Sequence, residues 1–112
     1  MLIGSENVWI NEKFVPATLR IEDGIIKEIL PYETVKTKDY KENRIIPGLI
    51  DIHDHGYGGM ASDGDVEVYR QWLAYFPKEG VTTFLVGIGA APEEKLVASL
   101  KGTRQVMEEK NK

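Results

Sequence analysis

The chain has 112 residues, enough for one ordinary domain, and its 42% hydrophobic and 29% charged residues are typical of soluble globular proteins. Its formal net charge is −4 and its Lys and Arg residues are scattered among acids, which argues against a nucleic-acid partner because phosphate binding needs a basic patch. It has no cysteine, so disulfides are excluded and a metal site must use nitrogen and oxygen ligands.

Nothing in the sequence indicates membrane insertion or secretion. No apolar run approaches the roughly 20 residues that span a bilayer. Residues 1–10 lack the basic stretch and long apolar core of a signal peptide. We therefore expect a cytoplasmic protein with no membrane partner.

Residues 1–46 are predicted to form a β-rich head. The short β-prone pieces are residues 2–3, 8–10, 14–15 and 18–21, with turns expected at Gly4-Ser5 and residues 11–13. Asp23-Gly24 is a strong hairpin signal, because Gly tolerates positive φ, and residues 25–30 read as the returning strand. Pro31 ends that strand, and the polar residues 31–44 are expected to form a connection with one more short strand.

Residues 47–112 have a different pattern of apolar residues, which predicts the element order β-α-β-α. The apolar residues 45–52 indicate a buried parallel strand, and a glycine-rich loop follows. A helix is predicted where Val66, Tyr69, Leu73 and Phe76 recur at spacings of three and four, ending at Pro77 and Gly80. A second strand follows over residues 81–86.

A second helix is predicted after Pro92, a residue that suits the first turn of a helix. Its apolar face is expected to carry Leu96, Leu100, Thr103 and Met107, with Gly102 as a weak point that costs about 1 kcal/mol relative to Ala. The alternation of strands and helices predicts a parallel sheet with helical crossovers, so the fold class is α/β. Two βα units do not close a barrel, and we expect the architecture to be incomplete.

The only two histidines of the chain lie together in the segment Pro47-Gly48-Leu49-Ile50-Asp51-Ile52-His53-Asp54-His55-Gly56. Side chains alternate along a strand, so His53 and His55 should point to the same side at its carboxyl end, which is the active-site face of a βα barrel. Two such imidazoles can share a divalent metal such as Zn, Fe or Ni. Asp51 has the same parity and is predicted to orient a ligand from the second shell, whereas Asp54 should point the opposite way.

A His-x-His pair on a strand also occurs without metal, and the glycines after it can serve only a tight turn. Here the pair stands between Pro-Gly and a glycine loop, and the whole segment resembles the strand-one signature of the amidohydrolase superfamily. Residues 21–29 are similar to the hairpin in the small β-sandwich of those enzymes. Within the superfamily, the loop Gly56, Tyr57, Gly58, Gly59 and the segment of residues 76–85 resemble N-acetylglucosamine-6-phosphate deacetylases.

The resemblance implies a partial β-sandwich head over residues 1–46 and, over residues 47–112, the first two βα units of a TIM-like (β/α)8 barrel. It implies a hydrolase that converts N-acetylglucosamine 6-phosphate to glucosamine 6-phosphate and acetate, using one or two divalent metals. His53 and His55 match the metal pair, and the glycine loop matches an active-site loop. A phosphorylated amino sugar is then the substrate, and a homo-oligomer is expected. Asp54 departs from the family, which usually has an apolar or β-branched residue between the histidines.

The family takes a metal-binding Glu, further His ligands and a general-base Asp from later strands, so the catalytic base is expected beyond residue 112. We therefore expect the chain to be an N-terminal fragment that is inactive alone. Two alternatives stay open. The chain can belong to another amidohydrolase, such as a dihydroorotase-like enzyme or an N-acyl amino acid deacylase, or it can be a non-catalytic fragment whose strand edges pair with another copy.

Overall fold

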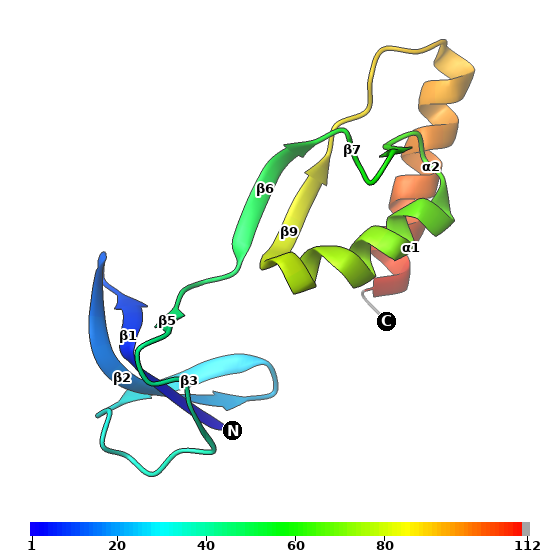
Figure 1. Ribbon diagram of the computed structural model, residues 1–112. Helices are drawn as coiled ribbons and strands as arrows, with labels where there is room; N and C mark the ends of the chain where they lie inside the picture. Colours follow the sequence, from blue (N-terminus) through cyan, green and yellow to red (C-terminus); the bar gives the residue numbers. More distant parts are fainter. Residues whose placement is uncertain (111–112) are drawn as a thin grey trace. The chain divides into compact units, whose positions relative to one another are not determined.

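The computed structural model describes residues 1–110, which fall into two compact units, Met1–Pro47 and Gly48–Lys112 (Figure 1). We call them the N-terminal unit and the C-terminal unit and describe each by itself. No helix in the described part of the chain is long and apolar enough to cross a membrane.

The N-terminal unit is one five-stranded sheet. Its strands are β1 (Leu2–Ile10), β2 (Lys13–Glu22), β3 (Ile25–Leu30), β4 (Lys38–Asp39) and β5 (Arg44–Ile45). The first three form an antiparallel meander in the order β3-β2-β1, while β4 and β5 both run parallel to β1 along its other edge. The predicted polar connection therefore contains two very short strands. Val8, Ala17 and Leu19 form the buried core of the unit.

Two tight turns link the meander, and both rely on positive φ. Asp23 (φ 51°) and Gly24 (φ 73°) form the predicted hairpin turn between β2 and β3. Asn11 (φ 49°) and Glu12 (φ 63°) form an equivalent turn between β1 and β2. Such two-residue turns match the right-handed twist of the strands that they join.

The expected break at Gly4-Ser5 is wrong, because β1 is continuous there and bulges between Ser5 and Val8. The fully buried Ser5 hydroxyl lies within hydrogen-bond reach of the carbonyl oxygens of Lys41 (2.9 Å) and Asn43, and accepts from the amide of Asn7 (2.9 Å). Pro16, which has no amide hydrogen, interrupts the β-prone pattern of β2, but it lies opposite the bulge, where a ladder hydrogen bond is not required.

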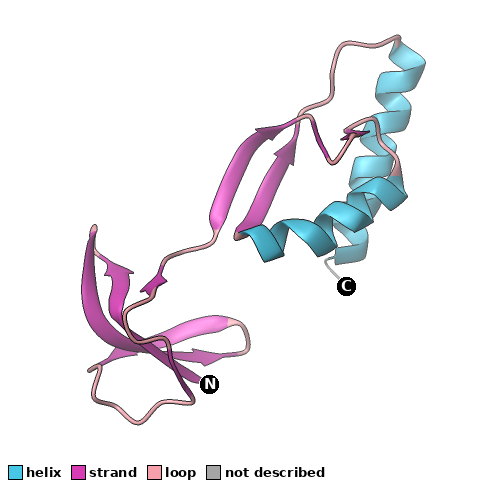
Figure 2. Cartoon of the chain, viewed as in Figure 1, coloured by secondary structure: helices cyan, strands magenta, loops and turns pink. Residues whose placement is uncertain are grey.

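The C-terminal unit is a mixed α/β arrangement. Its elements are β6 (Leu49–Asp54), β7 (Gly56–Tyr57), β8 (Met60–Ala61), α1 (Val66–Tyr75), the 3-10 helix η1 (Phe76–Glu79), β9 (Val81–Val86) and α2 (Glu93–Lys110). Strands β6 and β9 pair in parallel across the crossover through α1, and β7 and β8 form a small hairpin (Figure 2). The predicted β-α-β-α order and the α/β class are confirmed, whereas the assignment to the first two βα units of an incomplete TIM-like barrel stays a prediction. The expected burial of the first strand is wrong, because Leu49, Ile50 and Ile52 are 52%, 65% and 73% exposed.

Helix α1 supplies the core of this unit. Its N-cap Asp65 accepts hydrogen bonds from the amides of Glu67 and Val68, which satisfies two donors of the first turn. Tyr69 and Phe76 are buried, as their spacing predicts, together with Trp72 and with Val106 of α2, while the predicted Val66 and Leu73 are partly buried against this cluster. Gly80 (φ 85°) caps the end of η1, so the chain turns into β9 where expected.

The predicted apolar face of α2 is wrong in detail. Leu100 and Met107 are 60% and 63% exposed, and the buried positions are Ser99, Gly102 and Val106. A Cβ atom at Gly102 would collide with the carbonyl oxygen of Gly64, so glycine allows α2 to approach the preceding loop closely. Gly102 is therefore a packing residue rather than a weak point, because close contact requires a small side chain there.

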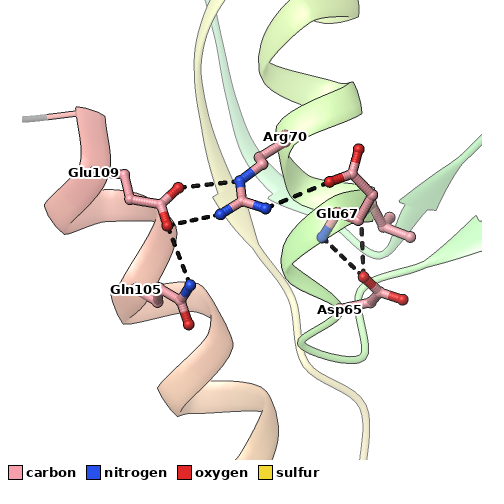
Figure 3. A network of polar contacts seen from close by, with 6 residues as sticks. Asp65, Glu67, Arg70, Gln105 and Glu109 are labelled. Atoms are coloured by element: carbon pink, nitrogen blue, oxygen red, sulfur yellow. Dashed lines mark hydrogen bonds and ion pairs between the residues drawn. The ribbon is translucent and has the colours of Figure 1, made fainter.

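A charged network also joins α1 to α2 (Figure 3). The Arg70 guanidinium donates to both carboxylate oxygens of Glu109 (2.8 and 3.1 Å), and it also reaches Glu67 one turn earlier in α1 (3.4 Å). Gln105 donates to the same Glu109 carboxylate (3.1 Å). All these side chains are exposed, so solvent screens each pair and the network contributes little to stability.

Candidate metal centre

His53 and His55 lie together at the carboxyl end of β6. The centroids of their rings are 4.5 Å apart, with the planes at 82°, and both residues are exposed. The pair therefore meets on one side of the strand, as the alternation of side chains predicts. Two imidazoles on one surface can offer nitrogen lone pairs to a common divalent ion.

The two aspartates of the same segment bind backbone amides. Asp51 accepts from the amide of His53 (3.0 Å), and Asp54 accepts from the amide of Gly56 (2.7 Å). Asp54, the residue that departs from the resembled family, therefore has a partner within its own strand end. These bonds hold the backbone on either side of the histidines. The predicted role of Asp51 in orienting a ligand stays a prediction.

Two residues that the sequence interpretation missed hold His55. A Cβ atom at Gly87 would lie 2.9 Å from Cε1 and 3.1 Å from Nε2 of His55, so the ring lies directly against the backbone at the end of β9. The buried Ser62 hydroxyl lies within hydrogen-bond reach of the carbonyl oxygens of His55 (3.0 Å) and Gly87 (2.5 Å), and so links the two strand ends. Gly87 could have been suspected from the sequence, because it directly follows a predicted strand. No feature of the sequence points to Ser62.

The glycine loop forms the β7–β8 hairpin directly after His55. Gly58 and Gly59 have φ of 62° and 80°, conformations that favour glycine, and they make the turn. Tyr57 does not extend freely from the loop. Its ring stacks on Tyr75 at the end of α1, with centroids 4.2 Å apart and planes at 24°, and it meets the edge of Phe76 at 5.8 Å.

The environment of Tyr75 raises the pKa of its hydroxyl above the ordinary value of 10. The largest cause is a side-chain hydrogen bond with Tyr57, followed by burial and by the hydrogen bond and negative charge of Glu79. These surroundings favour the neutral form of Tyr75.

A cavity of about 240 Å³ opens beside His55. Small and polar residues line it, among them Ser62, Asp63, Ala90 and Lys95. Asp63 has structural contacts here, because its carbonyl oxygen accepts from Ser99 (2.5 Å) and its carboxylate from the amide of Asp65 (3.3 Å). Within residues 1–110, no three side chains of His, Cys, Asp or Glu gather at one point, so the candidate centre consists of two imidazoles.

Comparison with solved structures identifies the fold of this arrangement. The crystal structure of N-acetyl-D-glucosamine-6-phosphate deacetylase from Mycobacterium smegmatis matches 96% of the chain with a TM-score of 0.85 and 24% sequence identity. A mutant of that enzyme in complex with N-acetyl-D-glucosamine-6-phosphate matches with the same score and identity. The chain has the fold of the N-terminal part of these deacetylases.

The resemblance expected from the sequence is thereby confirmed for the fold. The chain spans 32% and 29% of the length of the two solved chains. No protein-family model matches the sequence, and no curated protein matches it.

Proposed function

We propose that the chain is the N-terminal part of a metal-dependent amide hydrolase that deacetylates N-acetylglucosamine 6-phosphate. The observation that carries this proposal is the contact between the His53 and His55 rings at the end of β6, in a chain with the fold of the deacetylases. A glycine hairpin and a small polar cavity adjoin the pair, as a substrate site requires.

The donor set fits a borderline divalent ion such as Zn²⁺, Fe²⁺ or Ni²⁺. Imidazole suits these metals, and the chain has no thiolate that would favour a softer one. Such an ion, when bound, activates water and polarises the carbonyl of the acetamide. His53 and His55 hold the ion in this proposal. Ser62 bonds the backbone carbonyl of His55, and Gly87 lies against its imidazole ring.

The substrate proposal rests on two observations. One solved neighbour is in complex with N-acetyl-D-glucosamine-6-phosphate. The sequence of the hairpin, with Tyr57 before Gly58 and Gly59, resembles these deacetylases more than a dihydroorotase-like enzyme or an N-acyl amino acid deacylase. The reaction is hydrolysis of the amide to glucosamine 6-phosphate and acetate.

Two imidazoles do not make a catalytic zinc site, which has three protein ligands and an open position. The resembled family supplies the remaining ligands and the general base from later strands. We therefore expect the 112-residue chain to bind metal and to release no acetate from the sugar phosphate.

Equilibrium dialysis against Zn²⁺ tests the metal centre. The chain has only two histidines, so the double variant His53→Gln/His55→Gln removes every imidazole. We expect about one Zn²⁺ per wild-type chain and little binding to the double variant, because the remaining carboxylates are poorer zinc ligands. Asp23→Asn, in the turn of the N-terminal unit, is the control for zinc held by a carboxylate outside the candidate centre, and it should bind as the wild type does. Equal zinc content in wild type and double variant would contradict the proposal.

A further inference from the structure

We propose that Tyr75 is a positioning residue, which anchors the glycine hairpin through Tyr57 and thereby holds the backbone that leaves His55. The anchoring follows from contacts within the C-terminal unit. Its effect on metal binding rests on the proposed function, because it requires His55 to be a ligand.

The contacts form a continuous path from the hairpin to the core. Tyr57 stacks on Tyr75 at 4.2 Å and meets the edge of Phe76 at 5.8 Å. Phe76 is 7% exposed and packs against Phe84 of β9, with ring centroids 4.7 Å apart. Tyr57 is itself 39% exposed, so its attachment depends on these aromatic partners and not on general burial.

The hairpin needs such an anchor. It contains two pairs of residues, Gly56 with Ala61 and Tyr57 with Met60, and so small a hairpin is marginal by itself in water. Its turn, Gly58-Gly59, has high conformational freedom. Ser62 holds the base of the hairpin at His55. The stacked tyrosines hold the pair next to the turn, two residues after His55.

Tyr75 is well placed for this role because it ends α1, whose other aromatic residues form the core. Its ring provides the stacking surface for Tyr57. Replacing Tyr75 with Ala removes that surface. Alanine is the best helix former, so a loosened hairpin in this variant does not result from lower helix propensity of α1.

Amide hydrogen exchange of the full chain tests the anchoring without metal. In Tyr75→Ala we expect residues 57–61 to exchange roughly 3- to 10-fold faster, the effect of losing one aromatic pair. Tyr75→Phe keeps the ring and should restore most of the protection, and Gln71→Ala, on the exposed surface of α1, should change nothing. Tyr57→Ala removes the same contact from the exposed partner, so the double variant should exchange no faster than either single one. Unchanged exchange in both single variants would overturn the inference.

Zn²⁺ affinity, measured on the same variants, tests the consequence. We expect Tyr75→Ala to weaken binding by at most roughly 3- to 10-fold, the effect of losing one aromatic pair, with rescue by Tyr75→Phe. Equal affinity in wild type and Tyr75→Ala would overturn the positioning role. If the wild type binds no Zn²⁺, the proposed function fails, and the exchange measurement still decides whether Tyr75 anchors the hairpin.

Discussion

At the residue scale, position 87 leaves no room for a side chain. A Cβ atom there would lie 2.9 Å from Cε1 of the His55 ring, which is too close. Gly87→Ala should therefore displace the imidazole and weaken Zn²⁺ binding about 10-fold, the lower end of the range for an altered outer shell. Gly89→Ala is a matched control, because a Cβ atom there meets nothing within 4 Å. Titration of both variants with Zn²⁺ makes the comparison, and equal loss in the two would show that contact with His55 is not the cause.

Tyr75 gives a prediction for alkaline pH. Its raised pKa, caused first by the hydrogen bond with Tyr57, means that the folded chain keeps a proton that the unfolded chain loses near pH 10. This contribution to stability is complete below pH 10 and is lost as the pH rises above it. Absorbance titration should show ionisation above pH 10 from Tyr75 and also from Tyr32, whose pKa is raised by burial and by its hydrogen bond with Asp39. Tyr75→Phe should reduce this late absorbance change by one tyrosine, and an unchanged late phase in that variant would refute the assignment.

At the scale of elements, α2 shows how close packing overrides an apolar pattern. Gly102→Ala would place a methyl group against the carbonyl of Gly64 and should lower the free energy of unfolding by about 1–3 kcal/mol. The sign of this change separates the two effects, because helix propensity alone would raise the free energy of unfolding of the alanine variant by about 1 kcal/mol. Urea unfolding measures the change, with the exposed Lys101→Ala as control. A stabilised Gly102→Ala protein would mean that α2 does not approach this loop.

The elements that the sequence predicts well are those whose pattern reflects one local cause. The Asp23-Gly24 turn, the helix of α1 and both parallel strands follow from φ preference, aromatic spacing and apolar runs. The bulge of β1 and the buried positions of α2 do not follow from a local pattern. Ser5 finds its acceptors at residues 41 and 43, and Gly102 finds its neighbour at residue 64, so both depend on contacts that are remote in sequence.

At the scale of the whole molecule, the candidate site also combines a feature that follows from a local pattern with features that depend on remote contacts. The pairing of His53 with His55 follows from strand alternation and is predictable from the sequence. Their supports come from other elements: Ser62 from the segment after β8, Gly87 from the end of β9, and Tyr75 from α1. No local pattern brings these residues together, because the crossover through α1 places β9 beside β6.

The most direct test of the central claim is to observe the imidazole nitrogens while metal is added. Nitrogen-15 NMR of the 112-residue chain should show two imidazole spin systems, assigned with His53→Gln, and the account predicts that both shift together and saturate at about one Zn²⁺ per chain. Imidazole resonances that stay unchanged during the titration, or that respond at only one histidine, would contradict a metal centre shared by His53 and His55.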